Sequence, residues 1–151
     1  MSLETAYLFQ GMSEATRAKA AAAASAETCE SGAFLFRAGD AAEQFYILLE
    51  GRVRLSMRGA GQIAHIVSEP GDMLGWSSMV GHASYIASAE CVVPVKVLKF
   101  DRDRLMRLLE EDPAGGMDFY RRLAQMIARR LVASYGHALS LHGERDMRHW
   151  G

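Results

Sequence analysis

FRAGD at residues 36–40 and FYILLEGRV at residues 45–53 are the stretches that decide the fold of this chain. The pairs Gly39-Asp40 and Glu50-Gly51 favour turns, and the aromatic and aliphatic run between them has the composition of a buried strand. Short apolar runs separated by glycine, proline and aspartate continue to about residue 100. This pattern predicts an all-β sandwich or barrel, with strands at Phe34–Phe36, Phe45–Leu49, Val53–Met57, Ile63–Val67, Tyr85–Cys91 and Val95–Phe100.

Helices are expected on both sides of the β region. Residues 13–25 are rich in alanine, and Ser13 can cap a helix there. Asp101 can cap a second, short helix that ends near Pro113. A longer helix is expected to begin after Gly115-Gly116.

The long helix carries two apolar rows. One row has heptad spacing and predicts a homodimer interface; it consists of Met117, Tyr120, Ala124, Ile127, Leu131, Ser134 and Ala138. The row of Phe119, Leu123 and Met126 is expected to face the β region. The alternative is an ordinary amphipathic helix that packs only on its own domain. Gly136 is expected to weaken the helix beyond it, and the sequence leaves the conformation of residues 137–151 open.

Length and composition predict one globular domain of 151 residues: a helical segment over 1–32, a β-barrel over 33–100 and helices over 101–151. The 17 basic and 18 acidic residues nearly cancel, so net charge favours neither nucleic acid nor a membrane surface. The first residues lack the features of a secretory signal, and Cys29 and Cys91 are isolated. We therefore expect a cytoplasmic protein with two idle thiols.

The two opening stretches resemble the first glycine-containing motif of cyclic-nucleotide-binding domains. PGDMLG at residues 70–75 resembles the entrance to that family's phosphate-binding cassette. The resemblance extends over nearly the whole chain. It implies a mainly β fold with flanking helices: a double-stranded β-helix (jelly-roll) barrel with an N-terminal helix and a long C-terminal dimerisation helix. It also implies a regulatory sensor of the catabolite-activator type, here without the DNA-binding domain.

The cassette departs from the family at its two polar anchors. In ligand-binding members the glycine corresponding to Gly75 is followed by a glutamate that holds the ribose, and nine residues later by an arginine that neutralises the phosphate. Trp76 and Tyr85 occupy those positions. A buried phosphate needs charge-assisted hydrogen bonds that tyrosine does not supply, so we expect weak or absent binding of cAMP and cGMP. The candidate ligand contacts are Leu74, Gly75, Trp76, Ser77, Ser78, Met79, His82, Tyr85 and Ser88.

Three interpretations of the two aromatic residues remain open. Trp76 and Tyr85 either wall a pocket for another small ligand, or fill the cavity of a ligand-free dimerisation or scaffold module, or belong to an unusual cyclic-nucleotide site. A cavity beside Trp76 would favour a sensor over a scaffold.

Catalysis and nucleic-acid binding are not expected. The five histidines form none of the common metal-binding motifs, so no catalytic residue, metal or cofactor is predicted. A metal enzyme of the related barrel type is the least favoured alternative, with His65 beside Glu69 or His82 as its first candidates. The sequence after Leu141 is too short for a DNA-reading module, and the arginines of the long helix are interpreted as its solvated flanks: Arg121, Arg122, Arg129 and Arg130. A separate output protein is a further expected partner.

Overall fold

The computed structural model describes residue 3 and residues 6–57 and 64–142, and it describes the side chains of these residues up to residue 136, except at residue 64. Its strands form two antiparallel four-stranded sheets. The first sheet has the order β1 (Ser25–Cys29), β8 (Val95–Asp101), β3 (Gln44–Glu50) and β6 (Met73–Leu74). The second has the order β2 (Phe34–Phe36), β7 (Ser88–Cys91), β4 (Val53–Ser56) and β5 (Ala64–Val67).

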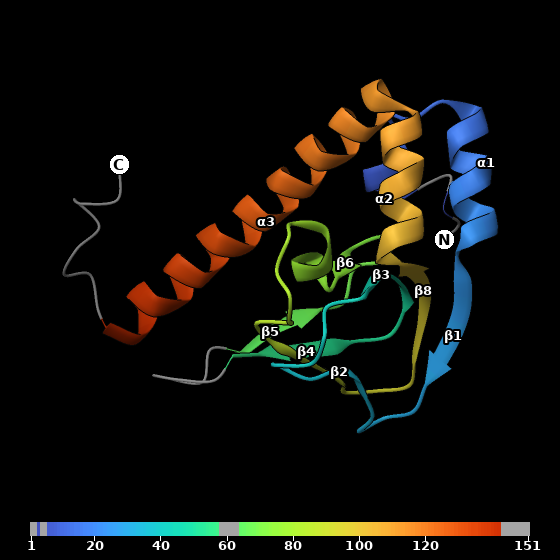
Figure 1. The fold of residues 1–151 in the computed structure, drawn as a ribbon. Coiled ribbons are helices and arrows are strands. Elements are labelled where there is room, and N and C mark those ends of the chain that lie inside the picture. The colour runs from blue at the N-terminus through green and yellow to red at the C-terminus, as the bar shows by residue number, and fades with distance from the viewer. Residues whose placement is uncertain (1–2, 4–5, 58–63, 143–151) are drawn as a thin grey trace.

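The helices lie together on one side of the sheets (Figure 1), where their buried residues pack against side chains of β3, β6 and β8. They are η2 (Tyr7–Phe9), α1 (Glu14–Ala23), α2 (Arg102–Glu111) and α3 (Pro113–His142), and a further short helix, η3 (Trp76–Met79), follows β6. The Ser13 side chain accepts a hydrogen bond from the Thr16 amide, and the Asp101 side chain accepts one from the Arg104 amide. Both predicted helix caps are therefore confirmed.

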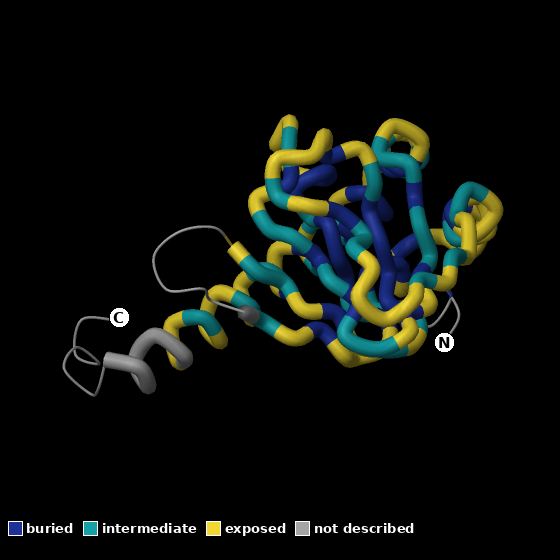
Figure 2. The backbone as a smooth tube through the Cα atoms, turned by 90° about the horizontal axis from the view of Figure 1, so that it is seen from below, coloured by how far each residue is buried: buried dark blue, intermediate teal, exposed yellow. Residues whose placement is uncertain are grey.

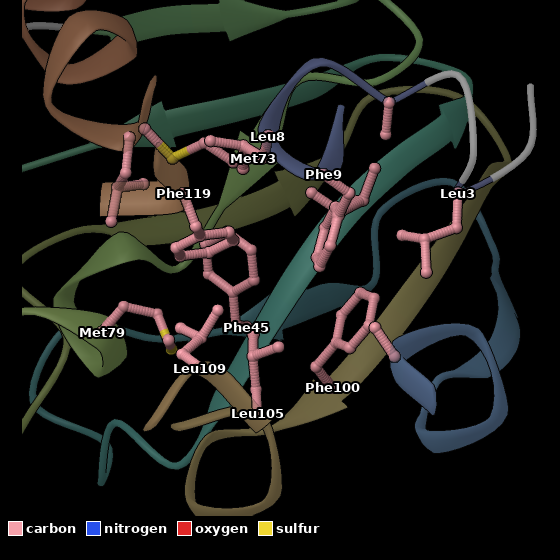
Figure 3. Packing of buried hydrophobic residues seen from close by; sticks show 14 of the residues in the cluster. Leu3, Leu8, Phe9, Phe45, Met73, Met79, Phe100, Leu105, Leu109 and Phe119 are labelled. Atoms are coloured by element: carbon pink, nitrogen blue, oxygen red, sulfur yellow. The ribbon is translucent and has the colours of Figure 1, made fainter. Parts of the chain in front are cut away.

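Strand β3 connects the two halves of the core because its side chains alternate between them. Phe45 and Ile47 point to the helices, and Tyr46 and Leu48 point between the two sheets. Figure 3 shows the helical half, in which Phe9, Phe45 and Phe119 meet. The predicted jelly roll is confirmed, although the two sheets share no strand and the barrel is open.

Residues 25–29 correct the expected helical segment over 1–32. They form strand β1, which pairs along its whole length with β8. An ion pair between Glu27 and Lys99, with 3.2 Å between Oε1 and Nζ, supports this pairing. Helix α1 ends at Ala23, so the alanine-rich composition correctly predicted a helix, and pairing with β8 determines the conformation that follows.

Helix α3 begins at Pro113, earlier than the expected start after Gly115-Gly116. Proline suits the first helical position because the amide it lacks would have no partner there. The Asp112 side chain accepts a hydrogen bond from the Gly115 amide at 3.2 Å. A Cβ atom at Gly116 would lie 2.5 Å from the carbonyl oxygen of Leu109, so this glycine allows α3 to approach α2 closely.

The two predicted rows of α3 differ in burial. Phe119, Leu123 and Met126 are buried against the sheet, as expected. Met117 is 76% exposed and Leu131 50% exposed. Helix α3 continues through Gly136 to His142, and residues 131–136 are exposed apart from the half-buried Ser134 (Figure 2). Side-chain contacts of Ala138 and the conformation of 143–151 lie outside the described residues.

Candidate ligand-binding site

The cassette begins at a glycine that the local geometry requires. Gly75 has φ +78°, a left-handed conformation that ends β6 and starts η3. A Cβ atom there would lie 3.0 Å from the carbonyl oxygen of Gln44 and 3.2 Å from the Tyr85 ring. The Ser78 hydroxyl donates to the Gly75 carbonyl at 2.7 Å. The cassette turn is thus tightly packed against the start of β3.

Tyr85 belongs to the interior between the sheets. Its ring stacks on Phe36, with 4.0 Å between centroids. Its hydroxyl donates to the Gln44 carbonyl at 2.6 Å and accepts from the Gln44 amide at 3.0 Å. Burial raises the pKa of Tyr85, so the phenol stays neutral at physiological pH. The observed strand β7 begins at Ser88, so Tyr85 lies just before it and not within it, as the predicted range Tyr85–Cys91 had it. The Tyr85 hydroxyl is hydrogen-bonded to the protein's own backbone.

The other predicted contacts differ in their burial and in their hydrogen bonds. Ser88 accepts a hydrogen bond from the Ala38 amide at 2.9 Å and therefore holds the loop after β2. His82 is exposed, and its ring lies 6.1 Å from that of Trp76. The remaining residues of the cassette are buried, apart from the half-buried Trp76; they are Leu74, Ser77 and Met79.

A mainly apolar cavity of about 270 Å³ lies between Trp76, the second sheet and α3. The second sheet and the chain before β7 contribute Leu55, Met57, His65, Ile86 and Ala87, and α3 contributes Ile127, Arg130, Leu131 and Ser134. We call this space the apolar cavity. It joins the cassette to the long helix.

A second cavity, of about 360 Å³, has a charged lining. Its lining includes Glu69 and Asp72 from the turn before β6, and Arg129 and Arg130 from α3. Tyr7 closes one side, where the Arg129 guanidinium lies 5.4 Å from the centre of its ring. We call this space the charged cavity.

Arg130 separates the two cavities, and sequence reasoning missed it. Its side chain is only 14% exposed, so its interpretation as a solvated flank of the helix is wrong. Nη2 donates to Oδ1 of Asp72 at 3.1 Å and also to the carbonyl of Met73. Nη1 is buried and has no hydrogen-bond partner among the described residues. The signal that could have found it is the helical period, because Arg130 follows Met126 by four residues and so continues the buried row of Phe119, Leu123 and Met126, whereas Arg129 does not.

His65 lines both cavities beside Arg130. Burial lowers the pKa of His65, and the neighbouring Arg130 lowers it further, while Asp72 opposes the shift. The imidazole is therefore neutral at pH 7. Arg130 keeps its charge because guanidinium pKa values lie far above neutral, although burial lowers its pKa and Asp72 opposes that change.

The predicted dimer row only partly faces away from the molecule. The Tyr120 hydroxyl donates to the Met79 carbonyl at 3.0 Å, so this residue holds α3 against η3. Ile127 is half-buried and lines the apolar cavity. Met117, Ala124 and Leu131 are exposed, and Val132, outside the predicted row, is 67% exposed.

The three residues considered as metal ligands do not all lie together. His65 and Glu69 line the charged cavity, whereas His82 lies beside Trp76. Within residue 3 and residues 6–57 and 64–142, no three His, Cys, Asp or Glu side chains are grouped closely enough to hold a metal ion. Burial raises the pKa of the Cys91 thiol to about 11, so it is a poor nucleophile at neutral pH. None of the described helices combines the length and apolar character needed to cross a membrane.

Comparison with known proteins connects this geometry to a family. The sequence model of the cyclic nucleotide-binding domain matches residues 26–112, which is more than half of the chain. A cAMP-dependent protein kinase regulatory subunit of Eremothecium gossypii is 29% identical over 107 residues, 71% of this chain and only 23% of that protein.

Two solved structures have the same fold. A putative cyclic nucleotide-binding protein from Geobacter metallireducens superposes with TM-score 0.75 and 25% identity, covering 85% of this chain and 95% of that one. A cyclic nucleotide-binding domain from Methylobacillus flagellatus gives TM-score 0.78 and 21% identity, covering 91% and 83%. This chain belongs to the cyclic nucleotide-binding domain family.

Proposed function

We propose that this chain is a non-enzymatic regulatory sensor domain that binds cAMP and cGMP weakly or not at all. The observation that carries this proposal is the state of Tyr85, which stands where the resemblance expects the phosphate-binding arginine. Its ring is packed on Phe36 and its hydroxyl is satisfied by Gln44. Two lost charge-assisted hydrogen bonds, at about 1.5–3 kcal/mol each, correspond to at least a hundredfold loss of affinity.

The apolar cavity favours a sensor for another ligand over a ligand-free scaffold. A site filled by both Trp76 and Tyr85 would favour the interpretation as a ligand-free scaffold. Tyr85 does fill the space between the sheets. Trp76, however, lines about 270 Å³ of unfilled space. A molecule bound there would touch both η3 and α3, and differential contact with two arrangements of α3 is the requirement for a switch.

The exposed apolar side chains of α3 support a homodimer through this helix. Leu131 and Val132 are 50% and 67% exposed, and Met117 is 76% exposed. A second copy of α3 is the partner proposed for this surface, because apolar side chains at heptad spacing suit a helix pair. A separate output protein is a further partner proposed for a module of this kind. The free thiols Cys29 and Cys91 support a cytoplasmic location.

Isothermal titration calorimetry with cAMP and cGMP tests the central claim. We expect dissociation constants no tighter than millimolar for the full chain. Tyr85→Phe is the matched control, because it removes the hydroxyl but keeps the ring; it should bind the nucleotides as weakly as the wild type. Micromolar affinity for either nucleotide would overturn the proposal.

Thermal unfolding with other metabolites tests the sensor against the scaffold. A ligand that binds only the folded state raises the unfolding temperature. A stabilising compound whose effect disappears in Trp76→Ala supports the sensor. Stabilisation by no compound, together with a stable dimer, favours the scaffold.

A further inference from the structure

The apolar cavity brings together large apolar side chains that the protein leaves partly uncovered. Met57 and Leu131 are each 50% exposed and Ile86 is 38% exposed, and all three line this one cavity. They come from the end of β4, from α3 and from the chain before β7. Contiguous exposed apolar surface marks interaction and ligand-binding sites on soluble proteins. An apolar molecule in the cavity would cover all three side chains at once.

The charge in the lining is already balanced. Arg130 is the one formally charged side chain of the described lining, since His65 is neutral. Its Nη2 donates to Asp72 and to Met73, and its Nη1 is buried, so neither terminal nitrogen is offered to the cavity. A charged ligand would lose hydration there without gaining a free opposite charge. The cavity therefore favours a neutral molecule.

His65 offers the cavity one polar contact. Its side chain is half-buried and makes no hydrogen bond to another residue in the part of the chain that the structure describes. Ser134 also lines the cavity, but its hydroxyl donates to the Arg130 carbonyl at 3.0 Å. A neutral imidazole has one donor and one acceptor nitrogen, so a hydroxyl group on a ligand can pair with either of them.

We propose that the apolar cavity binds a small neutral molecule with an apolar ring system and a single hydroxyl group, and that His65 forms a hydrogen bond with this hydroxyl. This inference rests on the proposed sensor function and names the ligand class of its site. The volume of about 270 Å³ is that of about nine molecules of liquid water, which suits a compact body of one or two rings. Since Leu131 belongs to α3, the bound molecule connects the second sheet with the proposed dimerisation helix.

Three probes of nearly the same shape and different charge test the proposal. The full chain is titrated with 2-naphthalenemethanol, which is neutral, with the anion 2-naphthoate, and with protonated 2-naphthylmethylamine, a cation. Binding is followed by NMR at the indole N–H of Trp76, assigned with the Trp76→Phe variant. We expect the alcohol to bind at least about tenfold more tightly than either ion, because only the ions have to give up the hydration of a charge.

Variants of the lining locate the alcohol. Ala87→Leu adds bulk to the cavity wall and should weaken binding at least about tenfold. Ala83→Leu is its matched control, because it adds the same bulk at an exposed residue outside the lining. His65→Leu should weaken binding by about two- to tenfold, which corresponds to one neutral hydrogen bond. His82→Leu is the control for this change, because His82 lies outside the lining, and both controls should bind the alcohol as the wild type does.

Four results would overturn the inference: no binding of the alcohol, ions that bind as tightly as the alcohol, an affinity that survives either Ala87→Leu or His65→Leu unchanged, or binding that is lost as the dimer forms at higher protein concentration. The last result would make a second copy of the chain the occupant of the cavity. Thermal unfolding of each variant without probe verifies that it is folded, and a loss of binding counts only for a folded variant.

Titration of the same samples with cAMP separates this failure from that of the proposed function. Failure of the alcohol together with weak cAMP binding overturns the ligand class alone. Micromolar binding of cAMP overturns the proposed function, whatever the three probes do.

Discussion

Tyr85 and Arg130 both lie near the cassette, but one is fully satisfied by the protein and the other is not. Tyr85 has a stacked ring and a hydroxyl that both donates and accepts. Arg130 has a paired Nη2, an Nη1 with no acceptor in the part of the chain that the structure describes, and a place in the lining of both cavities. The difference teaches that the position at which the resemblance expects a phosphate-binding arginine is part of the core, whereas the incompletely hydrogen-bonded side chain belongs to α3.

Replacing Tyr85 by alanine should produce the largest loss of stability. The change removes a buried ring and leaves both backbone groups of Gln44 without their partner, so we expect about 3–5 kcal/mol of destabilisation. Tyr85→Phe keeps the ring and should cost about 1–2 kcal/mol. Chemical denaturation measures both variants. A loss below 1 kcal/mol for Tyr85→Ala would mean that the two regions do not differ as described.

Asp72→Asn tests the ion pair between Asp72 and Arg130. It removes the negative charge beside a mostly buried guanidinium, which keeps a neutral amide oxygen and the Met73 carbonyl as acceptors, and we expect about 2 kcal/mol of destabilisation. Arg130→Met should cost less, because Asp72 is more exposed and retains the Met73 amide as donor. Denaturation of the two variants decides the order. If Arg130→Met costs more, the guanidinium contributes more to stability than its incomplete hydrogen bonding indicates.

Leu131→Glu tests the exposed apolar surface of α3 as the dimer interface, at a residue that is 50% exposed and also borders the apolar cavity. A buried charge in a helix pair is unfavourable, so the proposed dimer should weaken at least about tenfold, or about 1.4 kcal/mol. Gln125→Glu is the control, since this exposed residue lies outside the predicted row. Sedimentation equilibrium gives both dissociation constants. An unchanged dimer in Leu131→Glu would remove α3 as the interface.

The smallest expected effect is a pH dependence at His65. Because its pKa is lowered in the folded protein, the unfolded chain binds more protons once the pH falls below about 6.5, and stability decreases in that direction. His65→Gln should reduce this loss between about pH 6.5 and 5, and leave stability above pH 7 nearly unchanged. Denaturation across this range measures it. Parallel curves for the two proteins would show that His65 has an unshifted pKa.

The sequence predicted the repeating local features well. Turn signals and alternating apolar residues located β2, β3, β4 and β8, and side-chain caps located α1 and α2. The sequence did not predict strand β1, because the residues SAETC do not alternate between apolar and polar. Their extended conformation depends on pairing with β8. The short β6 escaped for a similar reason, since its two residues extend only through pairing with β3.

The site was less predictable than the fold. The resemblance drew attention to Gly75, Trp76 and Tyr85, and the structure places the first two at a left-handed turn and the start of a short helix. It did not reveal that Tyr85 bonds to Gln44, 41 residues earlier, or that Arg130 reaches Asp72, 58 residues earlier. Contacts over such separations depend on how the sheets and α3 pack, and no local pattern encodes them.

The close contact at Gly116 fixes one point of α3, so a tilt of the helix about this point displaces its distant residues most. Since even a methyl group would collide with the Leu109 carbonyl, α3 has little room to slide on α2 at this point. At 1.5 Å per residue, Arg130 lies about 21 Å along the helix from Gly116. A tilt of about 5° about Gly116 would displace Arg130 by about 2 Å, which is comparable to the small helix shifts seen at subunit interfaces. A glycine far from either cavity thereby determines how a small rotation is magnified where the helix meets the cassette.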